Sequence, residues 1–274
     1  MSLQRPLGLF MVCDEALPAR LQAGRQLSIP TAQILAPGRR DSSSAKALAR
    51  RFEEAGIRIT VVFCGFSGES YADIPTVAAT VGLVPPATRS QRLAEAKEIS
   101  DFAAELGVPA TALHIGFIRE DQDSPDYRAM VAIAQELCDH CLKNNQRLHL
   151  ETGQETAQEL IRFIAKVDRP NLAVNFDPAN MILYGCGEPL PALKLLGPLV
   201  KSVHCKDAKW AARPGQEWGQ EVPLGEGDVN MAAFIRVLNE IGYAGPLTIE
   251  REIVGDQQLL DMQKGVELLN RLNV

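Results

Sequence analysis

The sequence predicts one α/β domain over residues 1–274, of the (β/α)8 barrel class. Short apolar runs typical of strands alternate with helical patterns, which indicates parallel strands joined by crossover helices. No low-complexity segment or Pro/Ser linker divides the chain, and 274 residues suit eight such units, because a barrel of this class has about 250 residues. An open nucleotide-binding sheet usually carries a glycine-rich loop after its first strand, and the segment MVCDEALPAR has none. We therefore expect a closed barrel.

The predicted strands are eight short runs of mostly apolar residues. They lie at 7–12, 31–35, 57–63, 112–117, 147–152, 172–177, 200–207 and 247–252. Between them, the segment SSSAKALARRFEEAG predicts a helix, because it opens with serines able to cap and closes with a glycine. The segment NMAAFIRVLNEIGYAG predicts another helix, with Asn230 as its N-cap.

The composition is that of an ordinary soluble globular protein, with 46% apolar residues and a formal net charge of −6. No run of Lys and Arg exceeds two residues, whereas a surface that binds a nucleic-acid backbone is usually basic. The apolar run before Cys13 is too short for a secretory signal. We therefore expect a cytoplasmic protein with neither a nucleic-acid nor a membrane partner.

The six cysteines are scattered through apolar segments of a chain much longer than disulfide-stapled domains, so we expect reduced thiols. Cys138 and Cys141 form a C-x-x-C pair inside the segment AMVAIAQELCDHCLK, where apolar residues recur at helical spacing. The sequence has no second Cys/His pair with zinc-finger spacing. We therefore predict that both thiols pack in the core.

Four consecutive predicted strands each carry a residue that can ionise at or near their end. These residues are Glu151, Asp177, His204 and Glu250. One such residue would indicate only a strand that reaches solvent, but the strand ends of a barrel surround one mouth, so the four side chains should converge. Three carboxylates in one pocket repel one another unless a cation compensates them. Three oxygen ligands and one nitrogen suit one Mn²⁺, Mg²⁺, Co²⁺ or Zn²⁺, with positions left for substrate oxygens or water.

From Glu151 onward the segments ETGQET, NFDPAN, HCKD, VPLGEGDVN and IERE follow one another. In these segments, and over nearly its whole length, the sequence resembles the sugar phosphate isomerase/epimerase superfamily of xylose isomerase-like TIM barrels. That superfamily includes ketose 3-epimerases, inosose dehydratase, hydroxypyruvate isomerase and, more distantly, endonuclease IV. The resemblance implies a Glu, Asp, His, Glu metal set at the four positions above. It also implies that Glu151 and Glu250 exchange the proton on opposite faces of the substrate carbon.

Further residues are candidates for binding the substrate. His114, near the end of the fourth strand, either reaches the substrate or is a satisfied core histidine. Lys206 shares the strand face of His204, where it meets a hydroxyl or phosphate or forms an ion pair at the rim. The long loop after the seventh strand, which carries Arg213, predicts a lid or an oligomer contact. The full set is His114, Gln154, Asn180, Lys206, Arg213 and Glu226.

One position departs from the family pattern. Some epimerases carry a His three residues after the Asp of the sixth strand, where this sequence has Asn180. An amide can hydrogen-bond a hydroxyl but cannot shuttle protons at neutral pH.

The leading prediction is a metal-dependent isomerase or epimerase that acts on a small sugar or keto-sugar, phosphorylated or not, through an enediolate. Expulsion of a hydroxyl from the same enediolate gives a dehydratase or lyase as the alternative. An endonuclease IV-like phosphodiesterase is disfavoured, because its metal cluster needs more ligands than a chain with four histidines offers. An inactive barrel is disfavoured because all four ligands are present. The sequence is compatible with a homo-oligomer.

Overall fold

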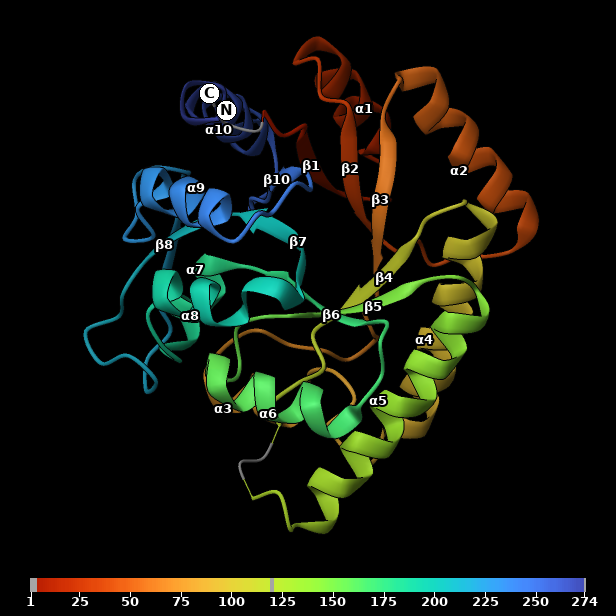
Figure 1. The fold of residues 1–274 in the computed structure, drawn as a ribbon. Coiled ribbons are helices and arrows are strands. Elements are labelled where there is room, and N and C mark those ends of the chain that lie inside the picture. The colour runs from red at the N-terminus through yellow and green to blue at the C-terminus, as the bar shows by residue number, and fades with distance from the viewer. Residues whose placement is uncertain (1–3, 119–120, 274) are drawn as a thin grey trace.

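A computed structural model describes residues 4–118 and 121–273, and confirms the predicted barrel (Figure 1). Eight parallel strands close in the order β1-β10-β7-β6-β5-β4-β3-β2. They are β1 (Leu7–Val12), β2 (Thr31–Leu35), β3 (Arg58–Phe63), β4 (Ala110–Leu113), β5 (Arg147–Glu151), β6 (Leu172–Phe176), β7 (Val200–Cys205) and β10 (Leu247–Ile249).

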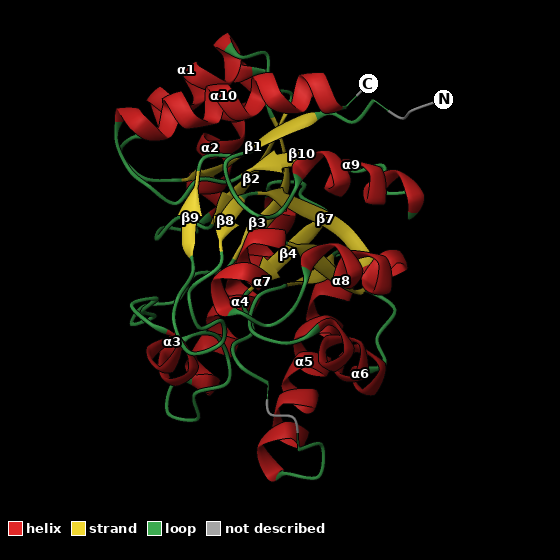
Figure 2. Ribbon diagram, turned by 90° about the vertical axis from the view of Figure 1, so that its left-hand side faces the viewer, coloured by secondary structure: helices red, strands yellow, loops and turns green. Residues whose placement is uncertain are grey.

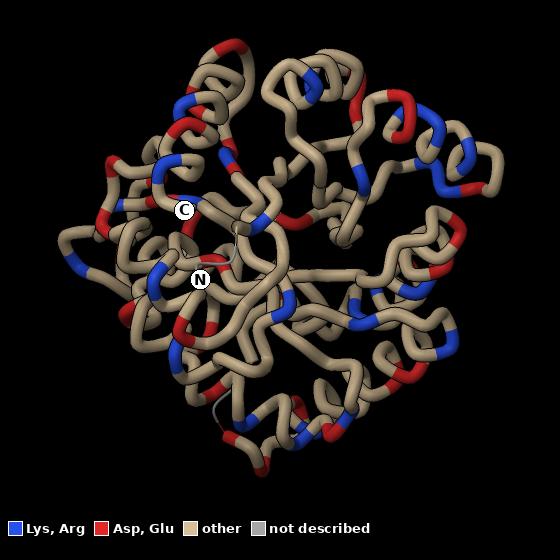
Figure 3. Tube along the Cα trace, turned by 45° about the horizontal axis from the view of Figure 1, so that its top comes forward, with Lys and Arg blue, Asp and Glu red and all other residues tan. Residues whose placement is uncertain are grey.

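Helices surround the strands on the outside (Figures 1 and 2). They are α1 (Leu17–Gln26), α2 (Ser42–Ala55), α3 (Ile74–Thr80), α4 (Arg89–Glu105), α5 (Pro125–Lys143), α6 (Ala157–Val167), α7 (Pro178–Tyr184), α8 (Pro189–Leu196), the 3-10 helix η1 (Gly197–Leu199), α9 (Met231–Glu240) and α10 (Asp256–Leu272). None of the helices within the described residues is long and apolar enough to cross a membrane. Lys and Arg are interspersed with Asp and Glu along the outer helices in the view of Figure 3.

The seventh strand ends at Cys205 and the eighth at Ile249, not at 207 and 252, and two further predicted element ends need correction. The fourth strand ends at Leu113 and not at 117, because Gly116 takes a left-handed φ of 96° and the carbonyl of Ile115 accepts a hydrogen bond from the backbone of Leu83 in a loop. Helix α2 is capped by Asp41, whose carboxylate accepts from the backbone N–H of Ser44 at 2.8 Å, so the serines begin the helix and do not cap it.

Other local predictions are confirmed. Asn230 caps α9 by accepting from the backbone N–H of Ala233, and Gly56 ends α2 in the left-handed region. Cys138 and Cys141 lie on the fully buried side of α5. All six cysteines are free thiols.

The barrel interior is divided into an apolar and a polar half. The apolar half comes mainly from β3 and β4 and contains Val61, Phe63, Ala110 and Ala112, with Phe10 and Leu35 packed against them. Gln33 of β2 is a polar side chain beside it, and its amide reaches Thr248. The polar half comes from β5, β6, β7 and β10. Here His149 on β5 contacts Ser202 on β7 at 2.8 Å across the interior, since β6 separates these strands. The functional site described below lies above this polar half.

The long segment after β7 folds into a small hairpin and does not remain an irregular loop. It pairs β8 (Asp207–Lys209) with β9 (Gln220–Val222) in antiparallel register. Trp218, just before β9, packs its ring against Tyr184 of α7 at a centroid distance of 4.6 Å. The hairpin is thereby attached to the mouth of the barrel.

Candidate metal centre

The four side chains predicted to converge do meet at the mouth of the barrel. Glu151 ends β5, Asp177 follows β6, His204 lies on β7 and Glu250 follows β10, and these strands are neighbours in the barrel. One potential ligand atom from each lies within 4.8 Å of the others. This is the one group of three or more His, Cys, Asp or Glu side chains in the described residues with spacing that could hold an ion.

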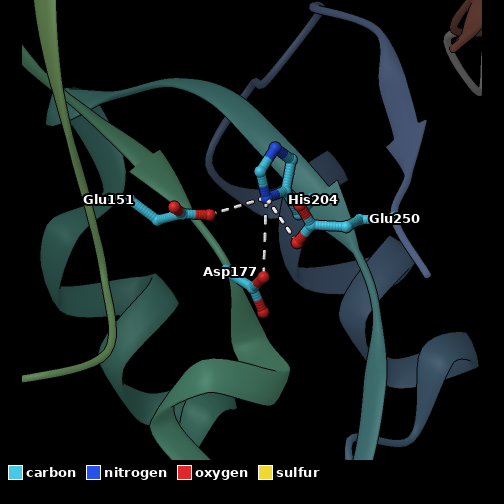
Figure 4. A group of neighbouring side chains, drawn as sticks. All are labelled: Glu151, Asp177, His204 and Glu250. Carbon is cyan, nitrogen blue, oxygen red and sulfur yellow. Dashed lines mark ion pairs between the residues drawn. The ribbon is translucent and has the colours of Figure 1, made fainter. Parts of the chain in front are cut away.

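The group is organised around Nδ1 of His204 (Figure 4). Glu151 Oε1 lies 2.6 Å from this nitrogen, Glu250 Oε2 3.1 Å and Asp177 Oδ2 3.5 Å. Glu151 and Glu250 approach it from opposite sides. All four side chains are buried, so water contributes little to their solvation.

Neighbouring groups fix the orientation of these ligand atoms. Nε2 of His204 lies 3.0 Å from Oε1 of Gln33, and the amide nitrogen of Gln33 donates to Thr248 Oγ1 at 3.1 Å. This contact keeps a proton on Nε2, so that Nδ1, which faces the carboxylates, is the nitrogen that can lose its proton and bind a metal. Asp177 is the N-cap of α7: its Oδ1 accepts from the backbone N–H of Asn180 at 3.0 Å, which leaves Oδ2 for the site.

Burial and mutual charge interactions shift the pKa values of all four residues of the group. Burial lowers the pKa of His204, but the charges of Glu250 and Glu151 outweigh it and hold this pKa well above its usual value. Burial raises the pKa values of Glu151 and Glu250, yet the neighbouring cations bring both below their usual range. For Asp177 burial prevails, and its pKa is raised.

These residues fit a divalent cation. Asp177 Oδ2 is a buried atom with no hydrogen-bond partner, and His204 Nδ1 faces only the carboxylates of the group, as expected of metal ligands. Three carboxylates and one imidazole are the donor types that suit Mg²⁺, Mn²⁺, Co²⁺ and Zn²⁺. The group could therefore hold one such ion.

Lys206 lies beside the metal group and is fully buried. Its Nζ contacts Glu252 Oε1 at 2.5 Å, Asn180 Oδ1 at 3.1 Å and Glu250 Oε2 at 3.2 Å. Burial lowers the pKa of Lys206, but Glu250 and Glu252 outweigh it and hold this pKa well above the usual value. Of the two roles predicted for Lys206, the structure thus shows the ion pair. The ammonium group of Lys206 also links Asn180 to Glu250 of the metal group.

His114 and Gln154 join the site on the opposite side, next to Glu151. Nε2 of His114 lies 2.7 Å from Glu151 Oε2, and its Nδ1 lies 3.1 Å from the amide of Gln154, which also contacts the hydroxyl of Tyr184. Burial lowers the pKa of His114, but the charge of Glu151 and the hydrogen bond to it raise this pKa to about 9. His114 therefore holds one oxygen of Glu151 as a charged partner in the metal-free protein.

The remaining two candidates lie apart from this group. Arg213 is exposed in the hairpin and pairs with Glu217 within the same turn. Glu226 is exposed in the turn after β9. Neither lines the cavity at the barrel mouth.

A cavity of about 670 Å³ opens beside the metal group. His114, Glu151 and Glu250 line one side of it, and residues of β1, β2 and β3 line the other. A substrate can therefore reach the two glutamates from the mouth of the barrel.

Sequence reasoning missed several residues that support the site. Asn175 donates to Glu151 Oε1 at 3.3 Å, Tyr184 contacts Gln154, and Gln33 orients His204. The role of Gln33 could have been inferred from the sequence, because Gln33 is an amide in the middle of the apolar run TAQIL. The contacts of Asn175 and Tyr184 depend on how strands and helices meet, and the sequence pattern carries no comparable sign of them.

Fold and site together define a (β/α)8 barrel with an acidic and imidazole donor set at its mouth. The family model for xylose isomerase-like TIM barrels matches residues 26–272. The chain belongs to this family.

A crystal structure of a xylose isomerase domain protein from Planctomyces limnophilus is 52% identical, with alignment over 98% of this chain and 97% of that chain and a TM-score of 0.95. A xylose isomerase-like TIM barrel protein from Mycobacterium smegmatis, in complex with magnesium, is 19% identical over 98% and 96% of the two chains, with a TM-score of 0.73. D-psicose 3-epimerase from Clostridium cellulolyticum H10, with D-tagatose, is 16% identical over 98% and 99%, with a TM-score of 0.73. Further solved structures with this fold bear the names of sugar epimerases and of a dehydratase. No curated protein matches the chain significantly in sequence.

Proposed function

We propose that this protein is a divalent-metal-dependent isomerase or epimerase acting on a small sugar or keto-sugar, with Glu151 and Glu250 as its acid/base pair. One observation carries the proposal. The two glutamates approach the same point from opposite sides, where Asp177 and His204 complete a metal donor set (Figure 4). A substrate carbon bound beside this donor set, in the cavity that both glutamates line, can meet a carboxylate on each face, which is the arrangement that epimerisation requires.

The bound metal would supply Lewis-acid stabilisation of the negative charge that develops on substrate oxygens. Glu151, Asp177, His204 and Glu250 would hold it. The chain's own groups perform the proton transfers: one glutamate removes the proton from carbon, and the other delivers a proton to the opposite face. His114 fixes Oε2 of Glu151, and Lys206 fixes Oε2 of Glu250, so both carboxylates are held in place.

Two neighbours complete the proposed site. The carboxamide of Asn180 is held by Lys206 and can hydrogen-bond a substrate hydroxyl without exchanging a proton. Gln154, whose amide contacts His114 and Tyr184, can hydrogen-bond a hydroxyl in the same way. The names of the epimerase and magnesium-bound relatives agree with this type of chemistry.

The test follows carbon-bound hydrogen by NMR in D2O, with Mn²⁺ saturating and a panel of ketoses, ketose phosphates, inososes and keto-glycosides. We expect one carbon-bound hydrogen of the substrate to exchange with solvent as product forms. Glu151→Gln and Glu250→Gln should each lower turnover by at least ~10²- to 10⁴-fold, as loss of a general base does. Glu240→Gln is a matched control, because Glu240 is exposed on α9 and pairs with Lys194.

Other outcomes would assign the site differently. Full activity of either Gln variant removes that residue from the mechanism, and product without deuterium indicates a hydride shift or a shielded proton. Release of water from the substrate identifies the dehydratase alternative on the same donor set. About three metal ions per chain by elemental analysis would favour the nuclease alternative over the sugar enzyme.

A further inference from the structure

The wall of the cavity that faces the metal group is apolar. It is formed by Phe10 and Val12 of β1, Leu35 of β2, Phe63 of β3, and Phe66 in the segment after β3. A substrate made only of hydroxyl-bearing carbons gains little from such a wall, because its hydroxyls lose water without hydrogen-bonding partners there.

This apolar wall begins directly at the metal group. The ring of Phe63 stacks on the imidazole of His204 at a centroid distance of 5.2 Å, and Phe10 meets the same imidazole edge-on at 5.4 Å. A ligand anchored at the donor set therefore has its other end beside the aromatic residues.

The apolar character continues to the rim of the cavity. Val254 is 86% exposed and Tyr71 is 44% exposed, and both line the cavity. Large apolar side chains with this much exposure at the edge of a pocket are typical of ligand-binding surfaces.

The charged groups around the cavity disfavour an anionic substrate. Among the described residues that line it, Arg20 is paired with Asp14 and Arg251 with Asp261 and Glu221. Glu69 and Glu252 add further carboxylates to the lining. A phosphate would therefore find no unpaired arginine among these residues.

The cavity is also large for a single small sugar. Its volume of about 670 Å³ lies within the range of roughly 300–1,000 Å³ that holds drug-sized ligands. A substrate that fills it carries a substituent beyond the carbons that react.

We propose that the substrate is an uncharged sugar or keto-sugar that carries an apolar substituent, such as the aromatic group of a glycoside. This proposal rests on the proposed function. The polar carbons lie at the donor set, between Glu151 and Glu250, and the substituent lies on the wall of Phe10, Val12, Leu35, Phe63 and Phe66. Sugar phosphates are excluded from the substrate class.

A matched series of hydroxamates tests this proposal by binding alone. The hydroxamate group chelates divalent metals and resembles an enediolate in shape and charge, so it anchors each probe at the donor set. Propionohydroxamate, 3-phenylpropionohydroxamate and 3-phosphonopropionohydroxamate differ in the group at the end of the chain. Calorimetric titration of each into the Mn²⁺-loaded protein gives three dissociation constants, with titration into Mn²⁺ alone and into metal-free protein as controls.

We expect the phenyl probe to bind at least about tenfold more tightly than propionohydroxamate, because its ring leaves water for the apolar wall. The phosphono probe should bind more weakly than propionohydroxamate. Val12→Asn should lower the ratio of the propiono to the phenyl dissociation constant, since Val12 is half-buried and lines the cavity. Leu195→Asn is the matched control, because Leu195 is 46% exposed on α8, outside the cavity lining, and that ratio should stay as in wild type.

The titrations give one result if only the proposed substrate class is wrong and another if the proposed function is wrong as well. If propionohydroxamate binds but the phenyl group adds nothing, or the phosphono probe binds most tightly, the substrate class is wrong and the proposed function stands. If no probe binds the metal-loaded protein, the proposed function fails as well. Comparison of the three probes with the wild-type protein tests the proposed substrate class even if Val12→Asn does not fold. Tyr71→Ser at the exposed rim provides a second variant that should lower the ratio of the propiono to the phenyl dissociation constant.

Discussion

The role of His204 depends on a residue three strands away in the barrel order. Gln33 on β2 accepts from Nε2 of His204, and Thr248 in turn fixes the amide of Gln33. A ligating imidazole needs this partner, because it determines which nitrogen carries the proton and which one faces the metal. Gln33 is thus a positioning residue for the metal centre.

Replacing Gln33 by Leu should lower metal affinity by roughly 10- to 100-fold, the usual effect of losing the partner of a ligating histidine. Titration of Mn²⁺ against a competing chelator measures this. Gln33→Glu keeps an acceptor for Nε2 and should bind metal more tightly than Gln33→Leu. Equal affinity in wild type and the Leu variant would contradict the assigned role.

His114 makes the metal-free protein sensitive to alkaline pH. Its pKa is about 9 in the folded protein, against about 6.5 in an unfolded chain. A pKa raised by folding contributes stability that is full below the unfolded value and is lost as pH rises through the folded value. The melting temperature of the metal-free protein should therefore fall between about pH 6.5 and 9.

The variant His114→Gln separates this effect from other groups. Gln cannot take up a proton, so its melting temperature should fall less over the same range. His204 and Lys206 are present in both proteins, so the difference between the two profiles reports the loss of His114 and its effect on Glu151. Parallel pH profiles of the two proteins would show that His114 is not the group responsible.

At the scale of elements, Asp207 connects the end of the barrel to the turn after β9. Its carboxylate accepts four backbone N–H groups, those of Ala208, Gly225, Gly227 and Val229, at 2.9–3.1 Å. Gly227 is required by this arrangement, because a Cβ there would lie 2.2 Å from Asp207 Oδ1. The GEGD segment is thus a structural turn held by a buried carboxylate.

Asp207→Ala should leave these donors without a partner and cost ~2–3 kcal/mol of unfolding free energy. Hydrogen exchange should accelerate at the amides of Gly225, Gly227 and Val229, while that of the β7 amides stays slow. Asp207→Asn keeps one acceptor oxygen and should lie between wild type and the Ala variant. Unchanged exchange in the turn of the Ala variant would refute the assignment.

The elements also indicate where sequence reasoning succeeds and fails. Strand positions followed from apolar runs because each strand is buried on at least one face, and this sufficed for β1, β2 and β5. The fourth strand was placed too late because the apolar run continues through Ile115, whose carbonyl accepts from the loop residue Leu83 and not from a neighbouring strand. The cap of α2 was missed because Asp41 precedes three serines that are equally able to cap.

At the scale of the molecule, the barrel divides its interior between an apolar and a polar half. Burial of charged groups is tolerated in the polar half because carboxylates, imidazoles and Lys206 satisfy one another. The convergence of the four strand-end residues was predictable, since barrel closure brings successive strand ends together. The apolar wall opposite them was not, because it depends on how far Phe66 and Tyr71 reach over the mouth.

Metal removal should therefore leave the barrel folded but less stable. The cations His204 and Lys206 already neutralise part of the carboxylate charge, so the metal-free cluster is compensated in part. An ion that binds only the folded state at 100 times its dissociation constant adds about 2.7 kcal/mol. For a chain of this size that corresponds to an increase in melting temperature of roughly 5 °C.

Asp177→Asn provides the control that assigns this shift to the four-residue group. The amide keeps the Oδ1 acceptor that caps α7, so the fold is retained, but it removes one charged ligand. Because burial raises the pKa of Asp177, its charge is unfavourable in the metal-free protein, and the variant should be as stable as metal-free wild type or more so. Thermal melts of both proteins in chelator and in Mn²⁺ should therefore show a large increase for wild type and little for Asp177→Asn. An equal increase in both would place the ion elsewhere, because a site that does not use Asp177 is unaffected by its loss of charge.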